Sequence, residues 1–524
     1  IGSQAGSSSV TQSYATGKVT GNHTNVGGLV GFSISGSSIS RCYATSEVIG
    51  AADDVGGLVG QNGETSAATI LDSYANGPVT GSSSVGALVG NNANGTISRC
   101  YATGKVIASS NMGGLIGINA TLAIASFWDM ETTELSSSKG GKGLSSQQMR
   151  SLSIFRNAGW GGHGWVMQEG QYPRLDWEVT GFLEIPAPEP VPLLGSGTEE
   201  DPFLVRNAAD FASLSSNVLI LDKHILLTSD IDCRQLIFES IGDFGPFVGV
   251  FDGDGHVIYN LIINRPNDNY IGIFRQAQNA FIHDLTLRGL RISGNDYVGG
   301  LAGSLSSCII TDCRSESTVS TLGQVSGNDY VGGLAGRLSA DTITNCHIEC
   351  DVAAQGQNAG GIAGYLKGTN STGIVSFSSA IRNVSGSIEV GGLLGCNHGG
   401  QVNNCFASGS VDGNNDVGGL VGLCEGDSIF AYGRIWKSYA TGRVNGTTYI
   451  GGLLGRQKSS SKVTSCYGLG KTTGLGGVGG LVGVREGGQI TSSYATGNVI
   501  GETYIGGLIG NNIPGNQILS FWDI

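Results

Sequence analysis

A short acidic segment holds the side chains of this sequence that are most capable of chemistry. Asp252 and Asp254 flank a glycine, and His256 follows them closely. Two carboxylates beside an imidazole can bind calcium or serve as a general acid and base. Asp230 and Asp232 form a similar pair. Alternation of Asp with Gly is also typical of a tight turn, and we favour a turn for both pairs.

The rest of the composition argues against an enzyme. A β-helix that cleaves acidic polysaccharides usually needs a basic residue and calcium-binding acids in one groove, whereas the 28 Lys and Arg residues here are dispersed. Only 7 His residues occur, and none combines with Cys at the spacing of a zinc site. The sequence also lacks a G-x-x-x-x-G-K-(S/T) loop and an array of calcium-binding nonapeptides. We therefore expect no catalytic, cofactor-binding or metal-binding residues.

The charge balance limits the possible partners. The formal net charge is −13, and no basic run occurs along the 524 residues. Nucleic acids and anionic membrane surfaces attract clustered Lys and Arg, so neither is an expected partner. The apolar stretches are short and are interrupted by Gly, Ser or charged residues, so we expect no membrane span.

A pentapeptide of the form G-G-Φ-Φ-G, in which Φ is apolar or Ala, recurs along the chain. Neighbouring copies lie 27 to 33 residues apart within each of two arrays. Such a period predicts a repeat protein, in which each repeat is covered by its neighbours. The copies begin at Gly27, Gly56, Gly86 (with Ala87 in second place), Gly113, Gly299, Gly332, Gly360, Gly391, Gly418, Gly451, Gly479 and Gly506.

Each repeat predicts two or three short strands. The segment V-G-G-L-V-G supplies β-propensity, and a second block, I-x-x-(C/S)-Y-A-T-G-x-V, alternates buried and polar positions, as in residues 39–48, 97–106 and 490–499. One repeat per coil stacks parallel strands about 4.8 Å apart. Parallel crossovers are usually right-handed. The predicted fold is therefore all-β, with arrays of right-handed parallel β-helix (β-solenoid) joined by a small irregular or helical segment.

The paired glycines are expected to form one corner in every coil. Two adjacent residues without side chains permit a bend, a positive φ or the close approach of a neighbouring backbone. A phosphate-binding loop is the functional alternative, but one such site in every coil would be implausible.

Two columns of similar side chains are predicted to run through the stacked blocks. Aromatic rings stacked at the spacing of the coils bury area and attract one another. The first column exchanges Cys and Ser, which indicates a small side chain with weak hydrogen-bonding ability. It contains Ser13, Cys42, Ser73, Cys100, Cys313, Cys346, Ser378, Cys405, Ser438, Cys466 and Ser493. The second contains Tyr14, Tyr43, Tyr74, Tyr101, Phe406, Tyr439, Tyr467 and Tyr494.

The 11 cysteines do not form an evident disulfide framework, because six of them occupy the column that also accepts Ser. Buried thiols are the interpretation that we favour. Isolated bridges between successive coils stay open as an alternative for Cys313 with Cys346 and for Cys396 with Cys424, since neighbouring coils are close enough for a disulfide.

The repeats resemble proteins that carry the GLUG motif, named for its Gly-Leu-any-Gly core. Residues 57–60 and 452–455 are clean examples. Residues 126–129 and the stretch that follows to Leu175 look like a segment that closes such arrays, and residues 195–203 and 251–256 look like one that opens them. The resemblance implies extracellular bacterial surface proteins, often adhesin-like, with solenoid architecture. It implies no catalytic residues.

Four regions follow from these patterns. We expect a first solenoid at residues 1–129, a closing segment with a Pro-rich linker at 130–194, an opening segment at 195–280 and a second solenoid at 281–524. Helices are expected at residues 147–155 and 208–214. Trp160, Trp165 and Trp177 are expected to cover the open end of the first solenoid.

The expected function is that of a secreted or cell-surface protein that is structural or adhesive and forms a stiff rod. Both chain ends look cut from a longer tandem array, and open ends would also permit self-association into a fibre. Surface glycans or a host or matrix receptor are the other partners considered. The alternative function is a β-helix that binds or cleaves carbohydrate, and aromatic residues exposed in a lateral groove would favour it.

Overall fold

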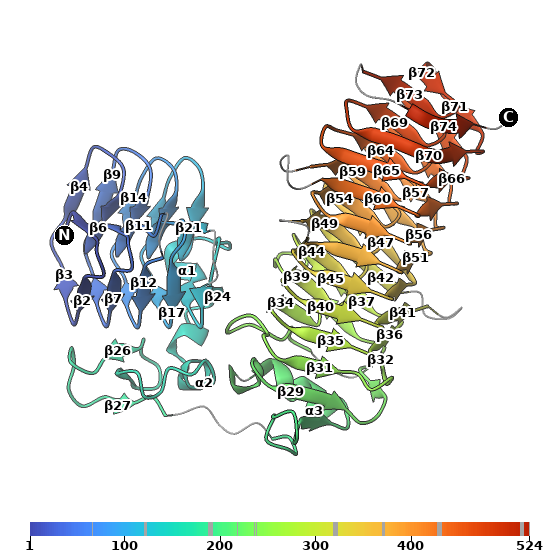
Figure 1. The fold of residues 1–524 in the computed structure, drawn as a ribbon. Helices are drawn as coiled ribbons and strands as arrows, with labels where there is room; N and C mark the ends of the chain where they lie inside the picture. Colours follow the sequence, from blue (N-terminus) through green and yellow to red (C-terminus); the bar gives the residue numbers. More distant parts are fainter. Residues whose placement is uncertain are drawn as a thin grey trace. The chain divides into compact units, whose positions relative to one another are not determined.

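Two units, each built mainly of stacked parallel strands, make up the chain (Figure 1). The first contains residues 1–190 with the short pieces 217–219 and 243–245, and the second contains residues 191–216, 220–242 and 246–524. The computed structural model describes residues 1–64, 67–119, 123–186, 192–216, 218–234, 236, 238–317, 323–368, 372–426, 432–513 and 518–522.

One coil of the first unit contains five short strands. The apolar residues after the glycine pair form β6 (Val30–Ser33). The second block forms β7 (Ser38–Ser40), β8 (Tyr43–Ala44) and β9 (Val48–Gly50). The strand β10 (Val55–Gly56) then holds the first glycine of the next pair. The sequence pattern thus accounts for each strand of the coil.

Equivalent strands of successive coils pair in parallel and in register, which confirms the predicted β-solenoid. Val55 lies between Val26 and Val85, for example. The strands are β1 (Ser3–Gln4), β2 (Ser9–Thr11), β3 (Tyr14–Ala15), β4 (Val19–Gly21), β5 (Val26–Gly27), β11 (Val59–Asn62), β12 (Thr69–Leu71), β13 (Tyr74–Ala75), β14 (Val79–Thr80), β15 (Val85–Gly86), β16 (Val89–Asn92), β17 (Thr96–Ser98), β18 (Tyr101–Ala102), β19 (Val106–Ile107), β20 (Met112–Gly113), β21 (Ile116–Asn119), β22 (Ala123–Ile124), β23 (Phe127–Asp129) and β24 (Lys142–Leu144), besides those of the coil above.

The second unit repeats this architecture over a longer array. One coil consists of β53 (Ile388–Gly391), β54 (Leu394–His398), β55 (Gln401–Asn403), β56 (Phe406–Ala407) and β57 (Val411–Asp412). Equivalent strands form parallel sheets of 21, 9, 9 and 8 strands. The buried apolar side chains form one core cluster that runs the length of the array. The right-handed sense of the coils stays a prediction.

Helices are few and short. The helix predicted at residues 208–214 is confirmed as α3 (Ala208–Ser213), which the Asn207 side chain caps. The single helix predicted at residues 147–155 is wrong. A 3-10 turn (Gln148–Arg150) is separated from α2 (Leu152–Asn157) by Ser151, whose backbone is extended. Among the helices of the described residues, none is long and apolar enough to cross a membrane.

Close backbone approach explains the glycine pair. A Cβ atom on Gly56 would lie 1.9 Å from the carbonyl oxygen of Val59 in its own coil. One on Gly57 would lie 2.0 Å from the carbonyl oxygen of Ala87 in the next coil. Neither glycine has a positive φ. The sequence suggested a bend, close backbone approach or positive φ as reasons for the paired glycines at this corner. Close approach explains them, whereas positive φ does not.

Two columns of other residues adopt the left-handed backbone instead. The corner column lies two residues before the first glycine of each pair. It contains Asn25, Asp54, Ser84, Asn111, Tyr297, Tyr330, Asn358, Glu389, Asp416, Tyr449 and Tyr504. The ladder column directly precedes the column of Cys and Ser. It contains Gln12, Arg41, Asp72, Arg99, Ala125, Asp284, Asp312, Asn345, Phe377, Asn404, Lys437, Ser465 and Ser492.

The column of Cys and Ser forms hydrogen bonds between successive coils, which fits the small hydrogen-bonding side chain predicted there. The Ser73 hydroxyl accepts the amide N–H of Cys42 at 3.0 Å and donates to the carbonyl oxygen of Leu71 at 2.7 Å. The second unit repeats this contact, in which the Ser378 hydroxyl accepts the amide of Cys346 at 3.1 Å. A small inward side chain that can form hydrogen bonds therefore suits the position.

All eleven cysteines are buried and free, as favoured from the sequence. The bridge considered for Cys396 and Cys424 is wrong. Cys396 pairs with Leu423, whereas Cys424 pairs with Asn397, so the two cysteines are one residue out of register. Side chains one residue apart point to opposite faces of a sheet. Cys313 and Cys346 do share a column, since the residues that follow them are paired.

The aromatic columns form stacked ladders. The first ladder (Tyr14, Tyr43, Tyr74 and Tyr101) has ring centroids 4.9 to 5.2 Å apart. The second ladder (Phe406, Tyr439, Tyr467 and Tyr494) has ring centroids 4.7 to 5.2 Å apart. Neighbouring rings within each ladder are nearly parallel, so the predicted stacking is confirmed.

Trp160, Trp165 and Trp177 do not cover the open end of the first solenoid, and that expectation is wrong. They belong to a covering segment, residues 145–186, and contact the rings of the first ladder along the side of the solenoid. The core at the end is covered by Trp128, whose indole N–H donates to the carbonyl oxygen of Leu135 at 3.2 Å.

We predict that Gly56→Ala destabilises the first unit by about 3 kcal/mol, because the new Cβ overlaps the carbonyl oxygen of Val59 and the corner of the coil must distort. Gly17→Ala is the matched control, since a Cβ there meets no atom within 4 Å. Urea denaturation followed by circular dichroism measures both variants. Equal midpoints for the two would contradict the close-approach explanation.

Candidate functional site

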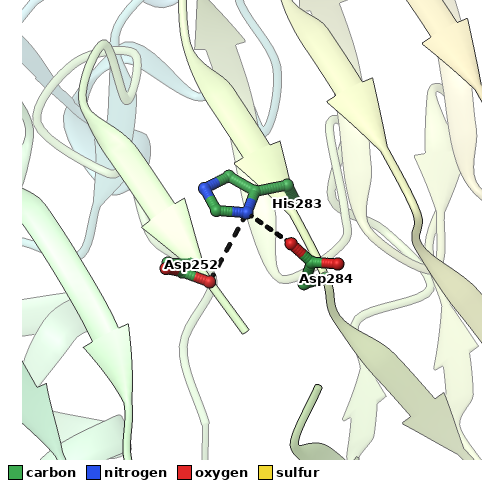
Figure 2. Close-up of side chains that lie close together, drawn as sticks. All are labelled: Asp252, His283 and Asp284. Carbon is green, nitrogen blue, oxygen red and sulfur yellow. Dashed lines mark hydrogen bonds and ion pairs between the residues drawn. The ribbon is translucent and has the colours of Figure 1, made fainter. Parts of the chain in front are cut away.

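A carboxylate–imidazole cluster lies at the start of the second array. Asp252 ends β31 (Val250–Asp252), and His283 ends β35 (Phe281–His283) in the next coil. The His283 Nδ1 atom lies 2.8 Å from an Asp284 carboxylate oxygen and 3.4 Å from an Asp252 carboxylate oxygen (Figure 2). We call these three residues the Asp–His cluster.

The pairs predicted from the sequence separate in the structure. The Asp252 carboxylate accepts the backbone N–H of Asp254 at 2.8 Å, which is the hydrogen bond of a tight turn. His256 pairs with Asp230 instead, at 3.3 Å. A hydrogen bond from the Val257 amide, assisted by His256, lowers the pKa of Asp230.

Asp232 is likewise held by a local contact. It forms an ion pair with Arg234 at 2.6 Å, and this contact lowers the pKa of Asp232 to about 2. Its carboxylate also accepts a hydrogen bond from the side chain of Asn260 in the next coil at 3.0 Å. These contacts hold Asp230 and Asp232 to residues of the next coil, and Asp232 also to Arg234, rather than to one another.

The Asp–His cluster has the donor set of a divalent cation site. One ligand atom from each residue lies within 4.8 Å of the other two. Each of these groups already has a protein partner, however, so the cluster is also complete as a hydrogen-bonded clamp between two coils. Asp252 was considered from the sequence, whereas His283 and Asp284 were missed because they lie one repeat further along the chain.

We predict that EDTA leaves the thermal midpoint of the protein unchanged, because protein groups satisfy the three side chains of the Asp–His cluster. Differential scanning fluorimetry with and without EDTA measures this. A midpoint that Ca²⁺ or Zn²⁺ raises in the parent chain, but not in Asp252→Asn, would instead identify a metal site.

A second group of charges lies on the outer side of the second array. Glu389 and Asp416 occupy successive positions of the corner column. Arg456 binds both carboxylate oxygens of Asp416, at 2.7 and 2.5 Å. Glu425 accepts hydrogen bonds from His398 and Lys458, each at 2.8 Å. We call these six residues the lateral charged cluster.

The pKa values of two carboxyl groups in the lateral charged cluster are shifted in opposite directions. Burial, together with the charges of Asp416 and Glu425, raises the pKa of Glu389 to about 7. Burial opposes ionisation of Glu425 as well, but the contacts with Lys458 and His398 outweigh it and lower its pKa. A protonated carboxyl near an ionised one is the arrangement of general acid–base chemistry. The six residues of the lateral charged cluster are dispersed in the sequence. They become neighbours only because successive coils stack at the strand spacing.

The first unit contains a cavity of about 470 Å³ between the solenoid and the covering segment. Arg41 and Asp176 form an ion pair at its wall. Burial lowers the pKa of His163, which also lines it. The lining residues are Arg41, Asp72, Gly162, His163, Gly164, Val166, Asp176 and Glu184. The sequence did not indicate this cavity, because its walls come from segments far apart in the chain.

We predict that the second unit loses stability as pH rises. Burial raises the pKa of Asp341 from 3.8 to about 7, so the folded chain keeps a proton that the unfolded chain releases. The free energy of unfolding therefore falls between about pH 4 and 7, by roughly 4 kcal/mol at most from this group.

Thermal midpoints measured across this range for the parent chain and Asp341→Asn test the prediction, with the slope against pH as the readout. The variant should show a shallower slope, to which Glu389 still contributes in the same direction. Identical slopes would contradict the assignment.

Comparison with known proteins identifies the repeats. The family model described as the GLUG motif matches residues 22–49, 81–107 and 386–412. The matched residues lie in both arrays, which confirms the resemblance found in the sequence.

Two known proteins are similar in sequence to part of this chain. Halomucin of Haloquadratum walsbyi is 31% identical over 127 residues, which are 22% of this chain and 1% of halomucin. A protein of Evansella cellulosilytica named as a Gly-rich membrane protein is 36% identical over 121 residues, which are 21% of this chain and 14% of that protein. The chain thus spans only a small part of these relatives.

A solved structure from Bacteroides ovatus, described as an immunoglobulin A1 protease, overlaps 60% of this chain and 86% of its own. The TM-score is 0.38 and the sequence identity is 19%.

Proposed function

We propose, from the premise that the chain is a GLUG-repeat β-solenoid protein, that it is a structural and adhesive segment of an extracellular surface protein. In this role it is a stiff spacer and not an enzyme. The observation that carries the proposal is the in-register pairing of equivalent strands from coil to coil within each unit, which one register shift, between Thr491 and Ser493, interrupts in the described part of the chain.

Stiffness follows from this pairing. A sheet of nine parallel strands in the second unit extends about 40 Å at the usual strand spacing. Every coil is hydrogen-bonded to its neighbours and shares one apolar core with them, so bending the array would strain many contacts at once. The described residues achieve this without a disulfide.

A surface location is supported by the relatives and by the charge. One relative, 36% identical over 121 residues, is named as a membrane protein. The net charge of −13 favours a hydrated surface that repels other acidic molecules. We also propose that the ends of the arrays permit self-association, because the edge of a solenoid offers unpaired backbone groups.

Carbohydrate cleavage is the second candidate function, and the lateral charged cluster is the observation that favours it. Glu389 and Glu425 provide an acid and a base, and the charge of Glu425 helps to raise the pKa of Glu389. Their strands, β53 and β59 (Val421–Glu425), belong to two different sheets, and His398 and Lys458 already donate hydrogen bonds to Glu425, whereas glycosidases place their two carboxyl groups on either side of a bound sugar. We therefore rank this function below the structural one.

Two measurements on the purified chain separate the candidates. Negative-stain electron microscopy should show elongated particles or fibres, and release of reducing ends from acidic polysaccharides should stay at background. Turnover that is lost in Glu389→Gln and retained in Asp232→Asn, outside the cluster, would replace the structural function with the enzymatic one.

A further inference from the structure

The second ladder is the exposed counterpart of the first. Tyr74 and Tyr101 of the first ladder are 0% and 2% exposed, because the covering segment packs on them. The equivalent rings of the second ladder are only partly buried, and Tyr494 is 40% exposed. The covering segment thus buries two rings of the first ladder, although Tyr14 of that ladder is 58% exposed, whereas none of the four rings of the second ladder is buried.

The covering segment recognises the first ladder through a repeated contact. Its indole rings lie 5.6 to 6.3 Å from ladder rings, tilted by 26 to 50°. Each indole N–H also donates a hydrogen bond to a residue of the ladder column. The three bonds are Trp177 to the Arg41 carbonyl oxygen (3.1 Å), Trp165 to an Asp72 carboxylate oxygen (3.3 Å) and Trp160 to the Ala125 carbonyl oxygen (2.9 Å).

The covering segment also satisfies the hydroxyl groups of the first ladder. The Tyr74 hydroxyl donates to the Glu178 carboxylate at 2.7 Å and accepts from Arg174 at 2.8 Å. The Tyr101 hydroxyl donates to the carbonyl oxygen of Pro173 at 2.9 Å. Recognition of the ladder thus combines ring contact with two kinds of hydrogen bond.

The second ladder presents the same groups without a cover. Asn404, Lys437 and Ser465 occupy its ladder column, and their backbone is left-handed like that of Arg41. Within the described part of the chain, no residue donates to the carbonyl oxygens of these three residues or bonds to the Tyr439 hydroxyl. The groups that receive the indole N–H bonds in the first unit are therefore available here.

Apolar side chains extend the open surface around the second ladder. Phe377, in the ladder column, is 57% exposed, and Trp436, on the neighbouring strand, is 43% exposed. Large aromatic side chains exposed together are typical of interaction surfaces.

We propose that the second ladder and its ladder column form a docking site for a Trp-bearing polypeptide segment of the chemistry of residues 145–186. The indole rings of the partner lie against the edges of the ladder rings and donate their N–H groups to the column carbonyls. This goes beyond the proposed function, because it concerns a specific partner of the side of the solenoid rather than the stiffness of the array.

A polypeptide suits this surface better than a sugar. Sugars stack on the faces of aromatic rings, but each face inside the second ladder is covered by the next ring, at interplanar angles of 5 to 14°. Only ring edges and hydroxyl groups remain for a partner. The covering segment approaches such edges with tilted indoles, as the first unit demonstrates.

A labelled synthetic peptide of residues 145–186, titrated into the full chain, tests the proposal by fluorescence anisotropy. We expect saturable binding that weakens about tenfold or more in Tyr439→Ser/Tyr467→Ser, since two aromatic contacts are lost. Tyr297→Ser is the matched control, because it removes a ring from a different stacked column and should leave binding unchanged. A peptide with all three Trp residues changed to Ala should not bind.

If the Tyr439→Ser/Tyr467→Ser variant still binds the peptide, the peptide has displaced the covering segment from the first ladder, and the proposal is overturned. The proposal is also overturned if an oligosaccharide binds the second ladder and the peptide does not. A further variant joins a second copy of residues 130–186 to the C-terminus through a flexible linker, which raises its effective concentration. Tyr439 and Tyr467 should then be protected from nitration by tetranitromethane, and unprotected rings would also overturn the proposal.

Discussion

Backbone hydrogen bonding between coils at the glycine corner is the contact on which both units depend. The carbonyl oxygen of Leu58 accepts the amides of Leu29 and Val30 from the neighbouring coil, at 2.9 and 3.1 Å. This close approach leaves no room for a Cβ at the second glycine, and the tight corner within each coil leaves none at the first. Since the corner recurs in each coil, it sets one register for all the strands, and the apolar, Cys/Ser and aromatic columns align as a consequence.

Alignment into columns also decides where chemistry can arise. Side chains about thirty residues apart become neighbours at the strand spacing, so groups that look dispersed in the sequence meet on one face. Asp252 meets His283 in this way, and Glu389 comes under the influence of Asp416 and Glu425. Most of these groups are satisfied by one another, which is why they stabilise the stack as readily as they suggest a reaction.

The aromatic ladders show how one motif serves two purposes. In the first unit Tyr74 and Tyr101 belong to a core, because the covering segment buries them and bonds their hydroxyl groups. In the second unit the same arrangement of rings lies at the surface. The repeat itself therefore does not determine whether a ladder stabilises the fold or presents a surface. The segments that pack on it make that difference.

The sequence by itself determined the solenoid, the corner and the columns, because these depend on spacing and residue type within one repeat. It also indicated α3 and the turn at Asp252. Only the tertiary structure decided that the Trp residues cover the side of the first unit, that Cys396 and Cys424 face apart, and which charges meet. These outcomes depend on contacts between coils and on left-handed residues such as Arg41 and Tyr297, whose side chains carry no local signal for that backbone.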